Sequence, residues 1–205
     1  MSLLACCWSL PTYAQSREER IEPSAKQMAK LQQLTPSGVA ATVFTKDDDL
    51  ETVAILDTSK AYSSNGAFTD RVRSDNFVRA LINKSTGAIV YQVYQTIRYN
   101  GDRRDFSSAT YSTPAGPVQV PVQTISSRLM ACFGGLCSYE DSVGFIVPEA
   151  VLREVAASYR PNASTPWRFR FQSQSAFDWE DRLMPAEIAG LLQAAEQSGY
   201  RKLRR

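Results

Sequence analysis

The sequence predicts an α+β fold: a single domain, mainly antiparallel β-sheet, with two or three helices packed on one face. Several runs of strand length alternate apolar and polar residues and are separated by short turns. Two later segments place apolar residues at helical spacing after a Pro-Glu start. Because the strand and helix patterns lack the regular alternation of βαβ units, antiparallel pairing is favoured.

Residues 1–14 contain no charge and read as an export signal. An apolar run over 3–10 precedes the small residues Thr12 and Ala14, so we expect cleavage between Ala14 and Gln15. No basic residue precedes the apolar run, so we expect the true start to lie further upstream. Two alternatives stay open: a lipobox-like motif acylated at Cys6, and an N-terminal segment that is retained and buried.

Residues 15–35 are expected to form a polar lead-in followed by a short helix. Pro23 suits the first helical turn, and the sequence Thr-Pro-Ser-Gly at 35–38 is expected to end the helix. A single α+β domain is expected over 36–200, followed by a basic tail at 201–205.

The first half of that domain is expected to contain four strands. They cover 39–45, 52–57, 76–82 and 89–99. The acidic residues 47–49 are interpreted as a turn, because a calcium loop would require a glycine in the middle. A surface loop is expected over 61–75, and the turn residues 83–87 predict a hairpin between the last two strands.

The second half is expected to contain further strands and two helices. A strand at 106–113 precedes a proline-rich edge strand near 118–122, and a second hairpin joins 124–133 to 138–147. Apolar stripes predict helices after Pro148 and after Pro185, the latter ending near Gly199. Between them, alternation of aromatic residues and arginines predicts a strand at 167–171.

Cys132 and Cys137 enclose a four-residue loop with two glycines, and we expect them to form a disulfide at the tip of the second hairpin. A redox-active pair is less consistent with this spacing, because catalytic dithiols favour two intervening residues at a helix start. A free reduced pair is the remaining alternative. No metal site is expected, because two thiols without histidine supply too few ligands.

Composition restricts the chemistry further. The chain has no histidine, which excludes Ser-His and Cys-His nucleophile pairs. We find no G-x-S-x-G, S-x-x-K, P-loop or G-x-G-x-x-G motif, and we expect no cofactor. The net charge is +2, and the last five residues carry four positive charges, so the rest of the chain sums to −2 and is near neutral. No nucleic-acid partner is therefore expected.

Five residues are weak candidates for a functional site. A hydrolase acting on a glycan could pair Glu140 with Asp178 or Asp181, although Glu140 cannot pair with its neighbour Asp141, because adjacent strand residues face opposite sides. Tyr94 and Arg98 share one strand face and could contact a ring or peptide ligand. Tyr91 and Tyr99 lie on the other face and are expected in the core.

These observations favour an exported bacterial protein, periplasmic or secreted, that acts as a non-enzymatic binding or envelope-accessory module. Its partner would be an unidentified protein, peptide or glycan. The first alternative is the carboxylate-based glycan hydrolase. The second is a lipid-anchored envelope structural protein, and membrane contact is expected only through an acylated Cys6 or the basic tail.

Overall fold

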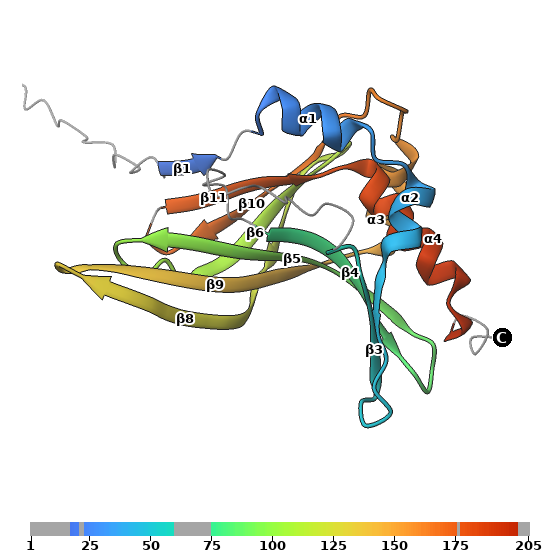
Figure 1. The fold of residues 1–205 in the computed structure, drawn as a ribbon, viewed down its shortest axis with the longest axis horizontal. Helices are drawn as coiled ribbons and strands as arrows, with labels where there is room; N and C mark the ends of the chain where they lie inside the picture. The colour runs from blue at the N-terminus through green and yellow to red at the C-terminus, as the bar shows by residue number, and fades with distance from the viewer. Residues whose placement is uncertain (1–16, 21–22, 60–74, 176, 201–205) are drawn as a thin grey trace, which may run out of the picture.

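A computed structural model describes residues 17–20, 23–59, 75–175 and 177–200. The predicted signal segment, the predicted basic tail and nearly all of the predicted loop at 61–75 lie outside the described residues. Within the described part, two β-sheets and four helices form the fold, which confirms the α+β class (Figure 1).

The larger sheet has six strands, all antiparallel to their neighbours. In spatial order they are β2 (Phe44–Lys46), β3 (Val53–Asp57), β4 (Asp75–Asn83), β5 (Ile89–Asn100), β9 (Leu136–Val147) and β8 (Gln123–Phe133). Both predicted hairpins are confirmed, β4 with β5 and β8 with β9. The sequence predicted them well because turn residues and alternation are local signals.

The smaller sheet has five strands. In spatial order they are β1 (Arg17–Arg20), β11 (Phe177–Leu183), β10 (Trp167–Ser173), β6 (Phe106–Thr113) and β7 (Gly116–Pro121). β1 runs parallel to β11, and the other pairs are antiparallel. The proline-bearing β7 is an edge strand, as expected. Proline has no backbone N–H to donate, so an interior strand would lose a ladder hydrogen bond there.

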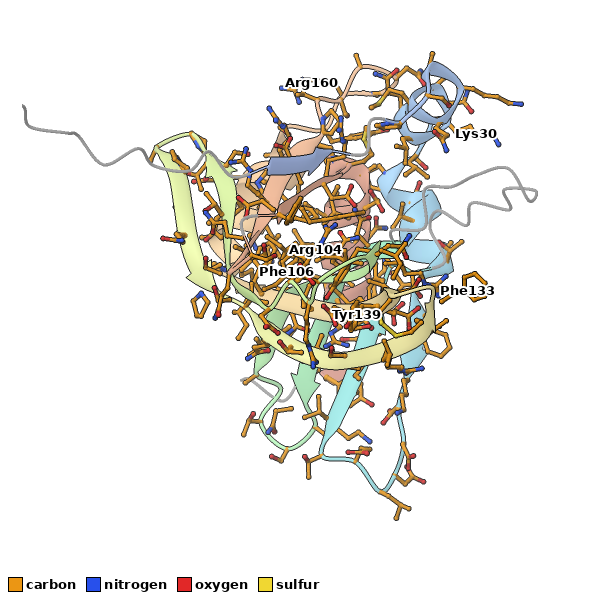
Figure 2. All side chains as sticks on the ribbon, turned by 90° about the vertical axis from the view of Figure 1, so that its left-hand side faces the viewer. Lys30, Arg104, Phe106, Phe133, Tyr139 and Arg160 are labelled. Carbon is orange, nitrogen blue, oxygen red and sulfur yellow. A yellow bond between two sulfur atoms is a disulfide. The ribbon has the colours of Figure 1, made fainter. Side chains whose placement is uncertain are left out.

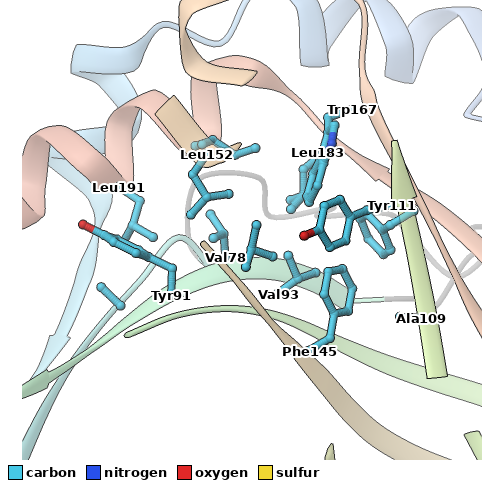
Figure 3. Packing of buried hydrophobic residues seen from close by; sticks show 14 of the residues in the cluster. Val78, Tyr91, Val93, Ala109, Tyr111, Phe145, Leu152, Trp167, Leu183 and Leu191 are labelled. Atoms are coloured by element: carbon cyan, nitrogen blue, oxygen red, sulfur yellow. The ribbon is translucent and has the colours of Figure 1, made fainter. Parts of the chain in front are cut away.

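The core lies between the two sheets and continues beneath the helices (Figure 3). Phe145 on β9 reaches across to the smaller sheet, where its ring stacks on Tyr111 at 5.8 Å and meets Phe171 edge-on at 5.4 Å. Tyr91 and Tyr99 are buried, which confirms their predicted place in the core.

The four helices are α1 (Ala25–Gln32), α2 (Pro36–Thr42), α3 (Glu149–Ala157) and α4 (Pro185–Gln197). Helix α4 is almost entirely buried and contacts β3, β4, α2 and α3. Helices α2, α3 and α4 gather at one end of the molecule, on the right in Figure 1, whereas α1 lies at the top. Thus the larger sheet is covered partly by the second sheet and partly by α4.

One predicted strand is wrong at its start. Residues 36–42 form helix α2, and only Phe44–Lys46, at the end of the predicted strand at 39–45, is extended. The Thr35 hydroxyl accepts a hydrogen bond from the Gly38 amide at 3.1 Å, and Pro36 occupies the first turn. The segment interpreted as a helix stop is therefore a helix start, because a capping threonine before proline serves that role.

Two strands were not predicted. β1 forms within the expected polar lead-in, and β11 forms where the sequence showed mainly charged residues around Trp179. Charges in β11 obscured its alternation, since Glu180 and Asp181 face opposite sides of the sheet and both are buried. Their burial depends on partners distant in sequence, so no local pattern could reveal it.

Candidate functional site

The predicted ligand candidates Tyr94 and Arg98 both lie on the outer face of the larger sheet. The Tyr94 ring stacks on Phe77 with centroids 4.5 Å apart, and the Arg79 guanidinium lies 5.1 Å from the Tyr94 ring centroid. Arg98 donates through Nε to Glu140 Oε2 at 2.5 Å. Both side chains are thus engaged by cross-strand neighbours.

A polar ladder crosses the same face beside Tyr94. Arg79 Nε donates to Gln92 Oε1 at 2.7 Å, and Gln92 Nε2 donates to Gln123 Oε1 at 2.7 Å. Gln92 is buried because Gly144 leaves space for it: a Cβ at that position would lie 2.9 Å from Gln92 Cδ. Burial lowers the pKa of Arg79. These polar groups satisfy one another within the sheet.

The carboxylates proposed for a hydrolase are placed on three different faces. Glu140 pairs with Arg98 on the outer face of the larger sheet. Asp178 accepts the Ser173 amide at 3.1 Å in the smaller sheet and, by strand alternation, shares a face with Glu180. Asp181 shares the opposite, inner face with buried Trp179. The topology therefore separates the three groups.

Asp141 points away from Glu140, as predicted for adjacent residues in a strand. Its carboxylate accepts hydrogen bonds from Tyr99 Oη at 2.6 Å and from Ser127 Oγ at 2.5 Å. Burial, followed by the hydrogen bond to Asp141, raises the pKa of Tyr99. Arg103 Nη2 also donates to Ser127 Oγ at 2.6 Å, so this network ties the β5–β6 connection to β8.

A groove of about 450 Å³ opens on the outer face of the smaller sheet, and its size is typical of small-ligand pockets. It lies over strands β6, β7, β10 and β11. Its lining combines charged, amide and hydroxyl side chains with a few apolar ones: Thr110, Tyr111, Ser112, Pro117, Arg168, Phe169, Arg170, Gln172 and Glu180.

Two arginines project into this groove and share one buried carboxylate. Arg168 donates to Glu180 Oε1 through Nε at 2.9 Å and also through Nη2, and Arg170 Nη2 donates to Glu180 Oε2 at 3.3 Å. Glu180 is almost fully buried, whereas the Arg168 and Arg170 side chains are 53% and 35% exposed. The carboxylate therefore holds two solvent-facing guanidinium groups in fixed positions.

Neutral polar groups form a second hydrogen-bonded cluster in the groove. Gln172 Oε1 accepts hydrogen bonds from Ser108 Oγ at 2.8 Å, Thr110 Oγ1 at 3.3 Å and Gln119 Nε2 at 3.2 Å. This network fixes the amide of Gln172 on the central strand next to Arg170. A ligand in the groove would thus meet oriented hydroxyl and amide groups beside the arginines.

A smaller cavity of about 270 Å³ adjoins the groove, since Ser112 lines both. Val151 and Val155 of α3, together with Pro114 and Pro166, give it a more apolar lining. The Ser112 carbonyl accepts a hydrogen bond from Trp167 Nε1 at 2.8 Å, which anchors the strand end between the two cavities.

The sequence contained part of the signal for the arginine groove. Arg168 and Arg170 alternate with three aromatic residues, and this pattern correctly predicted a strand with one arginine-bearing face. Glu180 could not be identified as their partner, because β11 was not predicted. Of the acidic residues around Trp179, the sequence suggests a site role only for Asp178 and Asp181.

The predicted disulfide between Cys132 and Cys137 is present, with the two Cα atoms 4.0 Å apart. The turn inside it is formed by Gly134 and Gly135, both with positive φ, at 57° and 82°. Glycine adopts this conformation without steric cost, which permits the two-residue turn between β8 and β9.

The described part of the chain contains neither a metal-binding cluster nor a membrane-spanning helix. No cluster of three or more His, Cys, Asp or Glu side chains is arranged to hold a metal ion there. Within the same residues, no helix combines the length and the apolar character needed to cross a membrane.

The fold and the groove together define an α+β protein of two sheets with an arginine-lined, solvent-facing groove. Comparison of the chain with protein-family models, with curated proteins and with solved structures finds no match.

Proposed function

We propose that this protein is an exported, non-enzymatic binding module whose groove binds a glycan bearing a carboxylate. One observation carries the proposal: Arg168 and Arg170 face solvent in a groove of ligand size, held in position by the buried Glu180.

The arginine pair explains the preference for a carboxylate. A guanidinium group presents several N–H donors in a planar arrangement that matches a carboxylate, and charge-assisted hydrogen bonds are stronger than neutral ones. Because Glu180 already orders both side chains, ligand binding costs less side-chain entropy. Among the described residues, the charged side chains that line the groove are two arginines and one glutamate, so this lining favours an anionic ligand.

The neutral wall of the groove favours a glycan among carboxylate ligands. Thr110 and Ser112 offer hydroxyl oxygens that can accept from the hydroxyl groups of a sugar, and Gln172 offers an amide NH₂ that can donate to them. An acidic peptide shares the carboxylate but offers these neutral groups only one backbone N–H and one carbonyl per residue, against several hydroxyl groups per sugar ring. It is therefore the outcome to be distinguished by experiment.

Binding without catalysis is supported by the placement of the acidic residues. Glu140, Asp178 and Asp181 occupy three separate sheet faces, whereas glycosidases place two carboxyl groups across one cleft. The absence of histidine removes the commonest general base. This arrangement favours a binding module over the carboxylate-based hydrolase.

Export to an oxidising compartment is supported by two features. The first fourteen residues resemble a signal sequence, and the Cys132–Cys137 disulfide is a type of bond that persists mainly outside the cytosol. Intact mass of the protein recovered from the cell envelope tests this point. Cleavage after Ala14 supports a soluble exported module, whereas an acyl chain on Cys6 supports the lipid-anchored alternative.

Isothermal titration calorimetry with uronic-acid oligosaccharides tests the groove. We expect the uronates to bind and their uncharged analogues to bind at least about tenfold more weakly, because a charged hydrogen bond contributes roughly 1.5–3 kcal/mol. The variant Arg168→Lys keeps a positive charge beside Glu180 but loses the planar donor pair, so we expect it to weaken uronate binding by a similar factor.

The control is Arg98→Lys, which alters an arginine–glutamate pair on the other sheet, outside the groove. It should bind uronates as the wild type does. Equal affinity of the wild type and Arg168→Lys would contradict the proposal, as would equal affinity for charged and uncharged sugars. Tighter binding of acidic peptides than of uronates would replace the glycan by a peptide.

A further inference from the structure

The tip of the β8–β9 hairpin exposes a cluster of apolar side chains. Phe133 is 92% exposed, and Leu129, Met130 and Leu136 are each more than half exposed. Figure 2 shows Phe133 at the outer edge of the molecule. Large apolar side chains gathered at one projecting tip differ from the scattered exposed residues of an ordinary surface and indicate an interaction site.

The tip is apolar in its sequence and is closed by a disulfide. Between Arg128 and Glu140 there is no charged residue. Cys132 pairs with Cys137 and Phe133 with Leu136 across a two-residue turn, so the backbone groups between the two strands are paired, whereas the other edge of β8 is the outer edge of the described sheet. The disulfide holds the strands together immediately behind Phe133. Because the β8 edge carries backbone groups that need water, such a tip suits the partly hydrated interfacial region of a bilayer and not its hydrocarbon core.

Apolar side chains project from both faces of the hairpin. Leu136 alternates with Ser138 and Glu140 and so lies on the outer face, and Phe133 lies opposite Leu136. Leu129 lies opposite Tyr139, whose ring stacks on buried Tyr99 at 5.5 Å, so Leu129 belongs to the inner face. A partner that covers this tip must therefore surround it.

Charges near the base of the hairpin balance one another. Among the described residues outside the core, three arginines and three acidic residues lie there: Arg98, Arg103, Arg128, Asp102, Asp105 and Glu140. The tip has no charged residue and its base is neutral, so we expect it to bind a medium that carries no net charge and contacts both of its faces. The boundary between lipid headgroups and acyl chains meets this description, because it can close around both faces of the tip.

We propose that the β8–β9 tip inserts into the interfacial region of a lipid bilayer and holds the protein at a membrane surface. Phe133 would enter the boundary between headgroups and acyl chains, where aromatic side chains are favoured. Because the base is electrically neutral, anionic lipid is not required. This surface lies on the larger sheet and does not depend on the arginine groove.

Vesicle co-sedimentation tests the proposal, using oxidised, non-acylated protein and phosphatidylcholine vesicles. We expect the wild type to bind and Phe133→Ser to bind roughly tenfold more weakly, from the transfer energy of one buried aromatic side chain. Addition of anionic lipid should change binding little. Leu50→Ser is the matched control, because Leu50 is 94% exposed on the β2–β3 loop and should leave vesicle binding unchanged.

Phe133→Trp provides a second measurement at the tip itself. Its fluorescence should shift to shorter wavelength and become protected from acrylamide when vesicles are added, because the indole leaves water. Equal vesicle binding by wild type and Phe133→Ser would overturn the proposal, and so would the absence of any added acrylamide protection in Phe133→Trp. Loss of a wild-type dimer in Phe133→Ser, without vesicle binding, would overturn it too and assign the tip to self-association instead.

Discussion

Glu187 is a fully buried carboxyl group in the first turn of α4. Its Oε2 accepts the Met184 amide at 2.7 Å, so it caps the start of the helix. Burial raises the pKa of Glu187 to about 7, against the smaller lowering effect of the Met184 hydrogen bond, and the nearby Asp181 raises it further. Between about pH 5 and 7, Glu187 therefore keeps its proton in the folded protein and loses it in the unfolded chain.

This carboxyl predicts a pH dependence of stability. A raised pKa in the folded state stabilises the fold at low pH, and that contribution is lost as pH rises from about 5 through about 7. The variant Glu187→Gln keeps an acceptor for the Met184 amide but does not ionise. Between pH 5 and 8, the free energy of unfolding of Glu187→Gln should rise by about 3 kcal/mol relative to wild type.

Urea denaturation at several pH values measures this difference. Glu149→Gln, in the first turn of the more exposed helix α3, is the control and should show no comparable change. A constant difference between Glu187→Gln and wild type across this range would show that the buried carboxyl does not titrate there.

At the scale of the element, the close contact between α2 and α4 depends on Gly190. A Cβ at this position would lie 2.5 Å from Val39 Cγ1 and 2.9 Å from the Pro36 carbonyl oxygen. Val39 is buried at this contact and is the only buried side chain of α2. The small residue lets the two helix backbones approach, and α2 is thereby held against the core.

The variant Gly190→Ala should therefore destabilise the protein. Alanine is favoured over glycine in a helix by about 1 kcal/mol, but overpacking a well-packed contact costs typically about 1–3 kcal/mol. We expect a net loss of about 1 kcal/mol or more in the free energy of unfolding, measured by urea denaturation. Gly199→Ala is the control, because no atom of the described residues other than its chain neighbours lies within 4 Å of its added Cβ. Unchanged or increased stability of Gly190→Ala would show that the helices separate without cost.

At the scale of the whole molecule, one aromatic cluster joins the two sheets. Phe145 of the larger sheet contacts Tyr111, Phe169 and Phe171 of the smaller one, with ring centroids 5.4–5.8 Å apart. The buried cluster then continues through Val78 and Tyr91 to Leu152 and Leu191 of the helices (Figure 3). A continuous core predicts that both sheets and the helices unfold together.

Phe145→Ala tests this cooperativity. We expect a loss of about 3–5 kcal/mol, since the variant leaves a cavity between the sheets. Far-ultraviolet circular dichroism and tryptophan fluorescence should give the same transition midpoint, lowered equally in the variant. The adjacent Ile146→Ala is the control: Ile146 is exposed on the outer face, and its loss should cost less than about 1 kcal/mol. Two separate transitions in the wild type would show that the sheets are independent.

Local patterns in the sequence determined much of the fold. Alternation and turn residues predicted both hairpins, the buried faces of Tyr91 and Tyr99, and the strand that carries Arg168 and Arg170. Two cysteines around a glycine pair predicted the disulfide. These features depend on neighbouring residues, whose backbone preferences and side-chain spacing act over a few positions.

Tertiary structure decided the rest. Thr35 and Pro36 are a local helix-start signal, but α2 has only seven residues, and the contact of Val39 with Gly190 holds it in the fold. Only strand pairing brings Glu180 to the two arginines and separates Glu140 from Asp178 and Asp181. A buried charge is stable only beside partners, and here those partners are remote in sequence. The arginine groove therefore arises from pairing between strands and not from any single segment.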